Sequence, residues 1–402
     1  MAHLIEQVAL LLFVAAVVAM IAQRFRFPYA VGLVITGLCL RFLPVGPPLQ
    51  LTRDLLFTTL LPPLIFEAAI FLPWRTLRGQ MPLVMVLATL GVVVAAAVTG
   101  YSMYALRGWP LVSALTFGAL IAATDPVSVI AAFREFGVPA RLRLLVEAES
   151  LFNDGTAAVL FGAAVAFGTA ASATVGGVAA NLLLGVVGGI ACGVAVAVAA
   201  RFLAGRTNDP LVEITFTVVA AYGSFLLAEH IGGSGVVATL AAGLVLGGRD
   251  ARKQVSPRSR VTVEAFWEFV AFAANSLIFL LIGIEEVQQN FSGLLPSALV
   301  AVLVVTLGRA ATVYPISALF ARSRLRVPAA HQHGLFWGGL RGALALALAL
   351  GLPPTIPLRE EIVSVTFAVV AFSIVVQGLT LPALLRRLGL DKEVRSGEPE
   401  AS

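Results

Sequence analysis

Apolar stretches of about 20 residues alternate along the chain with short segments that are charged or rich in Gly and Pro; a tilted helix needs this length to cross a bilayer. The pattern predicts thirteen spans, and we expect the first to be retained because His3 and Glu6 stand where a secretory signal is basic. The predicted spans cover residues 4–23, 29–45, 54–72, 81–106, 111–133, 142–167, 174–200, 211–229, 234–248, 264–284, 295–320, 329–351 and 361–385.

The composition agrees with a chain that folds in lipid. Hydrophobic residues make up 59% and charged residues 12% of it, and its mean hydropathy is +0.96, whereas soluble domains are about 25% charged. We therefore expect an all-α polytopic membrane protein. The net charge of +5 is explained by its placement along the chain, so no nucleic-acid partner is expected. Cys39 and Cys192 lie in apolar spans, where we expect them to pack as small side chains.

Lys and Arg are divided unevenly between the two sides of the predicted membrane layer. Most of the 27 basic residues fall in alternate connections, on the side that also holds the C-terminus. Because basic connections stay in the cytoplasm, we expect a multi-pass plasma-membrane protein with its N-terminus outside and its C-terminus inside. The exceptions are four residues on the other side and two within spans: Arg41, Arg53, Arg107 and Arg359, and Arg309 and Arg341.

The charge-free connection GTAASATVGG divides the chain into two parts. The first covers about residues 1–168 and the second about residues 210–388, with a linker helix over about 174–203 between them. Each part contains one interrupted helix, which is typical of inverted repeats in transporters. Residues 1–390 are expected to form one membrane unit, and residues 391–402 a short cytoplasmic tail without a soluble regulatory domain.

The segment VEAESLFNDGTAA places four polar groups inside one apolar span. Glu149 and Asn153 are four residues apart, as are Ser150 and Asp154, so the four side chains share one stripe of a helix. Asp154 falls near mid-membrane, where an ionisable group costs about 2.5–3.5 kcal/mol. The stripe must therefore face protein or water. A patch that only joins helices is the alternative, although such patches usually consist of Ser, Thr or Asn.

The fifth predicted span is interrupted at TDPVSV. Pro126 has no N–H and forces Asp125 out of helical geometry, so the helix must break near Thr124. Asp is a good N-cap and Pro favours the first helical position, which predicts a second half-helix starting there. The freed carbonyls and the Thr124 hydroxyl are oxygen ligands for an ion, and Asp125 is a further candidate. An ordinary kink with Asp125 as a cap alone is the alternative.

A second interruption is predicted in the twelfth span, where glycines surround Arg341 in FWGGLRGALALALAL. A buried Arg needs an anionic partner, for which we expect Glu149. Asp125 and Arg341 would also compensate the exposed dipole ends of the half-helices. Glu67 is a further carboxylate deep in a span and either joins the site or is a locally bonded, protonated Glu. Other charged residues lie nearer span ends, where snorkelling explains them: Arg309, Glu213, Glu229, Glu264 and Glu268.

Six motifs occur in the order LPPLIFE, TDPVSV, ESLFND, SGVVATLAAGLVLG, FWEFVAFAANSLIFLLIG and GGLRGALALAL. Together they resemble the monovalent cation:proton antiporter family, in the sodium/proton antiporter branch that includes the animal sodium/proton exchangers. The resemblance covers nearly the whole membrane part. It implies thirteen helices in two inverted repeats, two crossing broken helices, interleaved dimerisation and core subdomains, elevator-like alternating access and a homodimer.

The resemblance also implies roles for individual residues. Asp154 is similar to the family's ion- and proton-binding carboxylate, and an Asn-Asp pair such as the one here accompanies electroneutral one-for-one exchange. The remaining implied roles are cation ligands at Ser150, Thr124 and Glu67, an orienting contact from Asn153 to Glu67, and an ion pair between Glu149 and Arg341. No cofactor is implied, and the long cytoplasmic regulatory tail of the animal members is not matched here.

A single mid-membrane carboxylate can be neutralised by a proton or by a small cation with several oxygen ligands. Either state crosses with its charge covered, whereas the bare carboxylate does not. We therefore expect a monovalent cation to exchange for H⁺ at Asp154 in a protein surrounded by lipid, and the resemblance implies that this cation is Na⁺, and also Li⁺. A K⁺/H⁺ antiporter of the same fold and an uncoupled cation channel remain alternatives. An intramembrane hydrolase built on GGSG at residues 232–235 with His331 or His333 is a weaker one.

Overall fold

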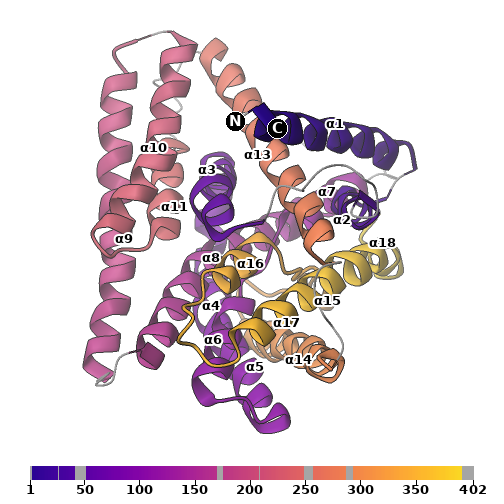
Figure 1. Cartoon of the computed structure of the whole chain (residues 1–402). Coiled ribbons are helices and arrows are strands. Elements are labelled where there is room, and N and C mark those ends of the chain that lie inside the picture. Colours follow the sequence, from indigo (N-terminus) through magenta and orange to yellow (C-terminus); the bar gives the residue numbers. More distant parts are fainter. Residues whose placement is uncertain are drawn as a thin grey trace.

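The computed structural model describes residues 2–25, 27–40, 51–169, 175–207, 209–248, 257–286 and 293–391. Within these ranges the regular structure is helical and contains no strand (Figure 1). Several residues discussed above lie outside the described residues: Arg41, the middle of the GTAASATVGG connection and the predicted tail after Asp391.

The helices follow the predicted spans in order. Those of the first part are α1 (Ala2–Phe25), α2 (Tyr29–Leu40), η1 (Asp54–Leu60), α3 (Leu61–Phe71), α4 (Trp74–Val86), η2 (Leu87–Gly91), α5 (Val92–Arg107), α6 (Leu111–Ile121), α7 (Val127–Glu135) and α8 (Ala140–Thr169). Those that follow are α9 (Val175–Ala204), α10 (Pro210–His230), α11 (Gly235–Leu246), α13 (Pro257–Glu286), α14 (Leu295–Leu319), α15 (Ala329–Trp337), α16 (Ala343–Leu350), α17 (Arg359–Phe372), η3 (Ser373–Gln377) and α18 (Gly378–Arg387).

The predicted all-α membrane fold is confirmed. Among the described residues, nine helical segments are long and apolar enough to cross a membrane, and three apolar helices are shorter. Each predicted span coincides with one helix, a continuous helical segment or a pair of half-helices. The number of membrane crossings stays a prediction.

Local sequence signals account for several helix ends. The Asp209 carboxylate accepts a hydrogen bond from the Leu211 amide at 2.9 Å, and Pro210 occupies the first position of α10. α5 ends at Gly108, whose φ of 66° suits glycine. Pro62 and Pro63 have no N–H to donate, and they lie in the first turn of α3, just after the π-helical segment η1. The helix that leads to Glu67 is therefore irregular.

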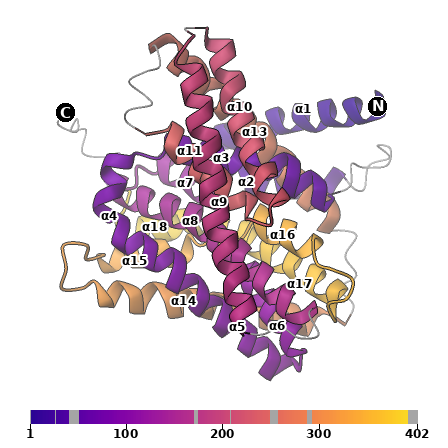
Figure 2. The same ribbon diagram turned by 90° about the vertical axis from the view of Figure 1, so that its left-hand side faces the viewer.

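The helices pack in two groups. The frame group comprises α1, α2, η1, α3, α9, α10, α11 and α13, and the crossing group comprises the remaining helices; the most extensive contacts fall within each group. Figure 2 shows α9 running across one whole face of the molecule, with α10 and α11 beside it. Glycine permits close approaches: a Cβ on Gly37 of α2 would clash with the Leu280 carbonyl oxygen of α13. Small residues at such crossings are typical of membrane helices.

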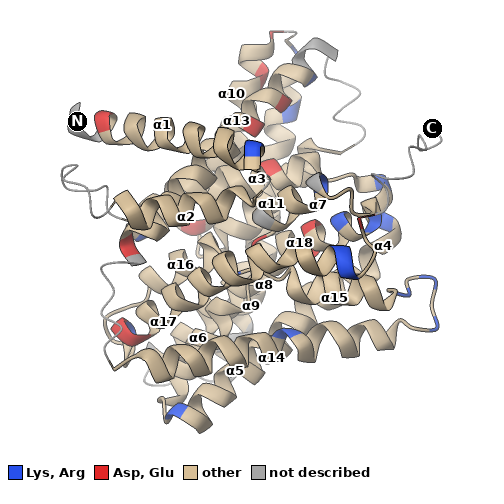
Figure 3. Ribbon diagram, turned by 90° about the vertical axis from the view of Figure 1, so that its right-hand side faces the viewer, with Lys and Arg blue, Asp and Glu red and all other residues tan. Residues whose placement is uncertain are grey.

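Charges are segregated over the surface. In Figure 3, Lys and Arg gather toward the side where the described chain approaches its C-terminus, whereas the side of the N-terminus is poorer in them. This arrangement agrees with the uneven distribution of basic residues between the predicted connections.

Candidate functional site

The two interrupted helices cross each other inside the crossing group. Non-helical backbone joins α6 to α7 and α15 to α16. The Asp125 amide donates a hydrogen bond to the Leu340 carbonyl at 2.7 Å, which links the two interruptions directly. A Cβ on Gly342 would clash with the Asp125 side chain, so glycine permits the close approach at this crossing. The predicted pair of crossing broken helices is confirmed.

Charged side chains satisfy the freed ends of the half-helices. Asp125 Oδ1 accepts a hydrogen bond from the Val127 amide at 2.9 Å and thereby caps α7. Arg341 Nη1 donates to the carbonyls of Ala122 and Ala123, at 2.7 and 2.8 Å, where α6 has ended. A carboxylate therefore lies at a helix N-terminus and a guanidinium at a helix C-terminus, which is the favourable arrangement for both dipoles.

Glu149 forms its ion pair with Arg309. Two guanidinium nitrogens of Arg309 donate to the two carboxylate oxygens of Glu149 at 2.7 and 2.9 Å, and one also donates to the Leu335 carbonyl at 3.0 Å. Both side chains are buried. The predicted Glu149–Arg341 pair is therefore wrong, as is the prediction that Arg309 snorkels. The sequence did contain a signal, since Arg309 lies near the middle of the apolar helix α14.

Asn153 connects this ion pair to the break after α6. Its Nδ2 donates to Thr124 Oγ1 at 2.6 Å and to Glu149 Oε1 at 3.0 Å, while its Oδ1 accepts from the Thr124 amide at 3.2 Å. Asn153 therefore orients Thr124 and Glu149, and the prediction that it orients Glu67 is wrong. Ser150 shares a hydrogen bond of 2.9 Å with Thr124 through the two hydroxyls.

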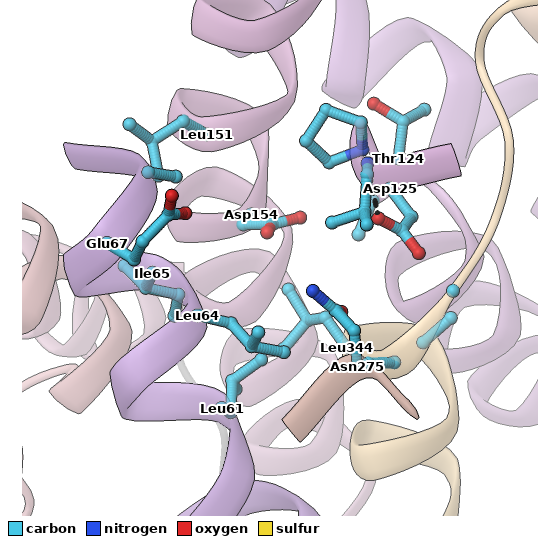
Figure 4. Close-up of a pocket in the computed structure, with 17 residues that line it drawn as sticks. Leu61, Leu64, Ile65, Glu67, Thr124, Asp125, Leu151, Asp154, Asn275 and Leu344 are labelled. Carbon is cyan, nitrogen blue, oxygen red and sulfur yellow. Dashed lines mark hydrogen bonds between the residues drawn. The ribbon is translucent and has the colours of Figure 1, made fainter. Parts of the chain in front are cut away.

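A cavity of about 70 Å³ opens beside the crossing, between the two helix groups. Its polar lining comes from Glu67 of α3, Thr124 and Asp125 at the break, Asp154 of α8 and Asn275 of α13. Figure 4 shows the Asp154 carboxylate between those of Glu67 and Asp125. Ser150 and Arg341 do not line the cavity and lie behind it, bonded to residues of the break.

The carboxylates of the cavity lack compensating charge. Among the described residues that line it there is no Lys, Arg or His, and neither Asp154 nor Glu67 accepts a hydrogen bond from the described part of the chain. Several carboxylates around one small cavity favour the uptake of protons or cations. Across the described residues, no three acidic, His or Cys side chains converge as a metal-binding group. A cation bound here would therefore also need hydroxyl, amide or backbone oxygens.

Asn275 is the lining residue that the sequence analysis missed. The signal was an amide inside the apolar segment FAANSLIFLLIG of α13, at 9% exposure. The hydrolase alternative finds no support in the geometry. Ser234 caps α11 by accepting a hydrogen bond from the Val237 amide at 3.3 Å, and His333 instead contacts the Tyr314 hydroxyl at 2.8 Å.

The chain is similar in sequence to a family of known proteins. Residues 9–387 match the family model described as sodium/hydrogen exchanger, transmembrane. The chain is 40% identical over 398 residues to the Na⁺/H⁺ antiporter ApNhaP of Aphanothece halophytica, covering 96% of this chain and 75% of that one. It is 34% identical over 404 residues to the Na⁺/H⁺ antiporter NhaH of Halobacillus dabanensis, covering 96% and 98% respectively.

The fold is also similar to a solved structure. The sodium proton antiporter MjNhaP1 of Methanocaldococcus jannaschii superimposes with a TM-score of 0.74 at 19% sequence identity, over 96% of this chain and 98% of that one. At this identity the likeness concerns the fold. It agrees with the all-α architecture and the crossing broken helices described above.

Proposed function

Because the chain belongs to the sodium/hydrogen exchanger family, we propose that it is a secondary active antiporter that exchanges Na⁺ for H⁺ across the plasma membrane. The observation that carries this proposal is the Asp154 carboxylate, which faces a small cavity without a cationic partner among the described lining residues. The relatives named above are Na⁺/H⁺ antiporters, which supports the same substrates here.

Competition for one carboxylate is sufficient to couple the two ions. Asp154 can be neutralised by a proton, or by a cation whose water molecules are replaced by several oxygen ligands. The two cannot bind at the same time. The neutralised site moves between the two sides, whereas the bare carboxylate is held back by its desolvation cost. Thr124, Glu67 and Asp125 line the same cavity and are the proposed further ligands. Ser150 supports Thr124 through its hydroxyl.

The neutral side chain at position 153 supports the proposal of electroneutral one-for-one exchange. Asn153 contributes an amide that is engaged by Thr124 and Glu149, so it adds no second titrating carboxylate beside Asp154. Each cycle then carries one positive charge in either direction. Li⁺ is proposed as a second substrate because it also prefers oxygen ligands.

Alternating access is proposed to move the crossing group against the frame group, as an elevator. The cavity lies between the groups, with Asp154 on one and Glu67 on the other, so a relative displacement would change which side it opens to. The frame group would contain the dimerisation surface of a homodimer in lipid. The basic side seen in Figure 3 is proposed to be cytoplasmic, with the N-terminus outside.

Purified protein in proteoliposomes with a pH-sensitive dye inside tests the proposal. A preset pH gradient is challenged with Na⁺, Li⁺ or K⁺, with and without the membrane potential clamped at zero. We expect Na⁺ and Li⁺ to collapse the gradient and clamping to change nothing. K⁺ as the effective ion would make the substrate wrong, a dependence on potential would contradict electroneutrality, and current without proton movement would indicate a channel.

The pH dependence is a second expectation of this assay. Since H⁺ and Na⁺ compete for one carboxylate, acidification must raise the apparent KM for Na⁺. Where protons dominate the site, each unit fall in pH should raise that KM about tenfold, as expected for one proton per cation. A maximal rate that falls on acidification at saturating Na⁺, with an unchanged KM, would contradict competition.

A further inference from the structure

Asn275 stands opposite Asp154, on a helix of the other group. It belongs to α13 (Pro257–Glu286), whereas Thr124, Asp125 and Asp154 belong to the crossing group. Figure 4 shows its side-chain amide directed into the cavity, toward the region between Asp154 and Asp125. With 9% exposure, the residue is buried and its amide has access to little beyond this cavity.

The side-chain amide of Asn275 makes no hydrogen bond to any residue in the described part of the chain. The next residue differs: the hydroxyls of Ser276 and Tyr29 of α2 share a hydrogen bond of 2.6 Å. Successive residues of a helix point about 100° apart, so Ser276 joins α13 to α2 while Asn275 faces the cavity. Buried amides are normally hydrogen-bonded, and the partner of this one must therefore come from the contents of the cavity.

We propose that Asn275 supplies its side-chain carbonyl oxygen as a neutral ligand to the transported cation and thereby helps to determine which cation is selected. The inference rests on the proposed exchange at Asp154. The carboxylates of the described residues do not converge into a metal-binding group by themselves, so additional oxygens are needed. Besides Glu67, Asn275 is the polar lining side chain from the frame group, and the other frame residues that line the cavity are apolar.

Because the Asn275 side chain is uncharged, it can affect which cation binds but not how many protons are exchanged. An amide oxygen adds a coordination position without adding a titrating group, so it does not alter the number of protons exchanged per cation. It does alter ligand number and cavity size, on which discrimination between hard cations depends. Because Asn275 and Asp154 lie on different helix groups, their contact through the ion exists only while the groups are arranged as they are here.

The test compares Asn275→Ala, Asn275→Leu and Asn275→Ser with wild-type protein. Leu retains the approximate volume without an oxygen, whereas Ser retains an oxygen. Exchange kinetics are measured in proteoliposomes at an alkaline pH, where protons compete little, with Na⁺ and Li⁺ in turn. We expect the Ala and Leu substitutions to raise the apparent KM for Na⁺ about tenfold, because each removes one oxygen ligand of the cation. We also expect them to change the ratio of the KM values for Na⁺ and Li⁺, and Ser to recover part of both.

Ser276→Ala is the matched control, since it removes a polar group at the same depth of α13 but on the side of α2. It should leave the KM ratio unchanged. An equal loss of maximal rate for both ions in the Asn275 variants, with unchanged KM values, would reduce Asn275 to a packing residue and overturn the inference. Tighter Na⁺ binding in Asn275→Ala would do so as well, because the amide would then be a donor that competes with the cation for Asp154.

Cation-dependent thermal stabilisation of the detergent-solubilised protein separates this inference from the proposed function. It reports binding without transport, so a variant that no longer transports can still be assessed. Failure of the proposed function appears in the wild type, as an absence of Na⁺-driven proton movement. Failure of the inference appears as identical Na⁺ titration curves for the wild type and Asn275→Ala. If the wild type responds to K⁺ instead, the same comparison made with K⁺ decides the role of Asn275.

Discussion

Two sets of polar side chains lie close together in this molecule and differ in how completely they are bonded. The paired network consists of Glu149, Arg309, Asn153, Thr124 and Arg341. Each of its members makes at least one hydrogen bond to another helix or to the opposite interruption. In a bilayer, such pairing is required wherever polar groups hold helices together, because lipid offers no partners. This network fixes the two interrupted helices against α8 and α14.

The cavity set consists of Asp154, Glu67 and Asn275, and it lacks such partners among the described residues. An unpaired polar group in this position is costly unless something from outside the chain binds to it. Thr124 and Asp125 are paired and also line the cavity; for the other residues, pairing rather than burial or depth separates the structural polar groups from those proposed to bind the ion. Removing a member of the cavity set should therefore abolish or weaken transport while the fold is retained. Removing a member of the paired network should lower the stability of the fold.

The largest effect is expected for Asp154→Asn, which should abolish Na⁺-dependent proton movement in proteoliposomes. Asn has nearly the same shape as Asp but carries no negative charge, so it cannot take up a proton or balance the charge of a cation. The folded protein should persist because Asp154 contributes no hydrogen bond within the described residues, and size-exclusion chromatography checks this. Asp209→Asn is the matched control, since Asn also caps helices well and Asp209 only caps α10. Cation-dependent proton flux that survives in Asp154→Asn would disprove the assignment.

The next effect concerns the paired network. Arg309→Ala should destabilise the protein by about 3–5 kcal/mol, because it leaves Glu149 buried without its bidentate partner. The thermal unfolding midpoint in detergent measures this loss. Adding Glu149→Leu to Arg309→Met should recover much of the stability, since replacing both charges by apolar groups is often neutral. A double variant no more stable than Arg309→Met alone would show that the two residues do not act as a pair.

Gly342→Ala should have a smaller but clear effect, of about 1–3 kcal/mol, as expected for overpacking. The added Cβ would meet Asp125 and force apart the two interruptions. The exchange rate should fall with the stability, because the break carries Thr124 and borders Asp154. Gly79→Ala is the control: a Cβ on Gly79 in α4 meets nothing within 4 Å, and Ala favours a helix. Equal midpoints for the two variants would mean that the crossing is loose.

Most of this architecture could be predicted from the sequence because the bilayer penalises any polar group that has no hydrogen-bonding or ionic partner. The helices, both interruptions and the placement of Asp125 and Arg341 at the interruptions follow from this rule. The partner of Glu149 does not, because Arg309 and Arg341 both lie in apolar spans. Which guanidinium reaches the carboxylate depends on how α14 and the break between α15 and α16 are placed around α8, and spacing along the chain says nothing about that. Asn275 was missed for a similar reason, since its chemistry depends on the cavity it faces.

The smallest expected effect comes from two buried serines that differ in pairing. Ser373 accepts a hydrogen bond from the Arg341 amide at 3.0 Å, whereas the hydroxyl of Ser317, equally buried at 1% exposure, has no partner in the described structure. Ser373→Ala should therefore lower stability by about 0.5–1.5 kcal/mol, seen as a lower thermal midpoint. Ser317→Ala removes an unsatisfied polar group and should leave the midpoint unchanged or raise it. Equal losses in both variants would mean that burial alone decides the cost, and the distinction between paired and unpaired groups would not hold.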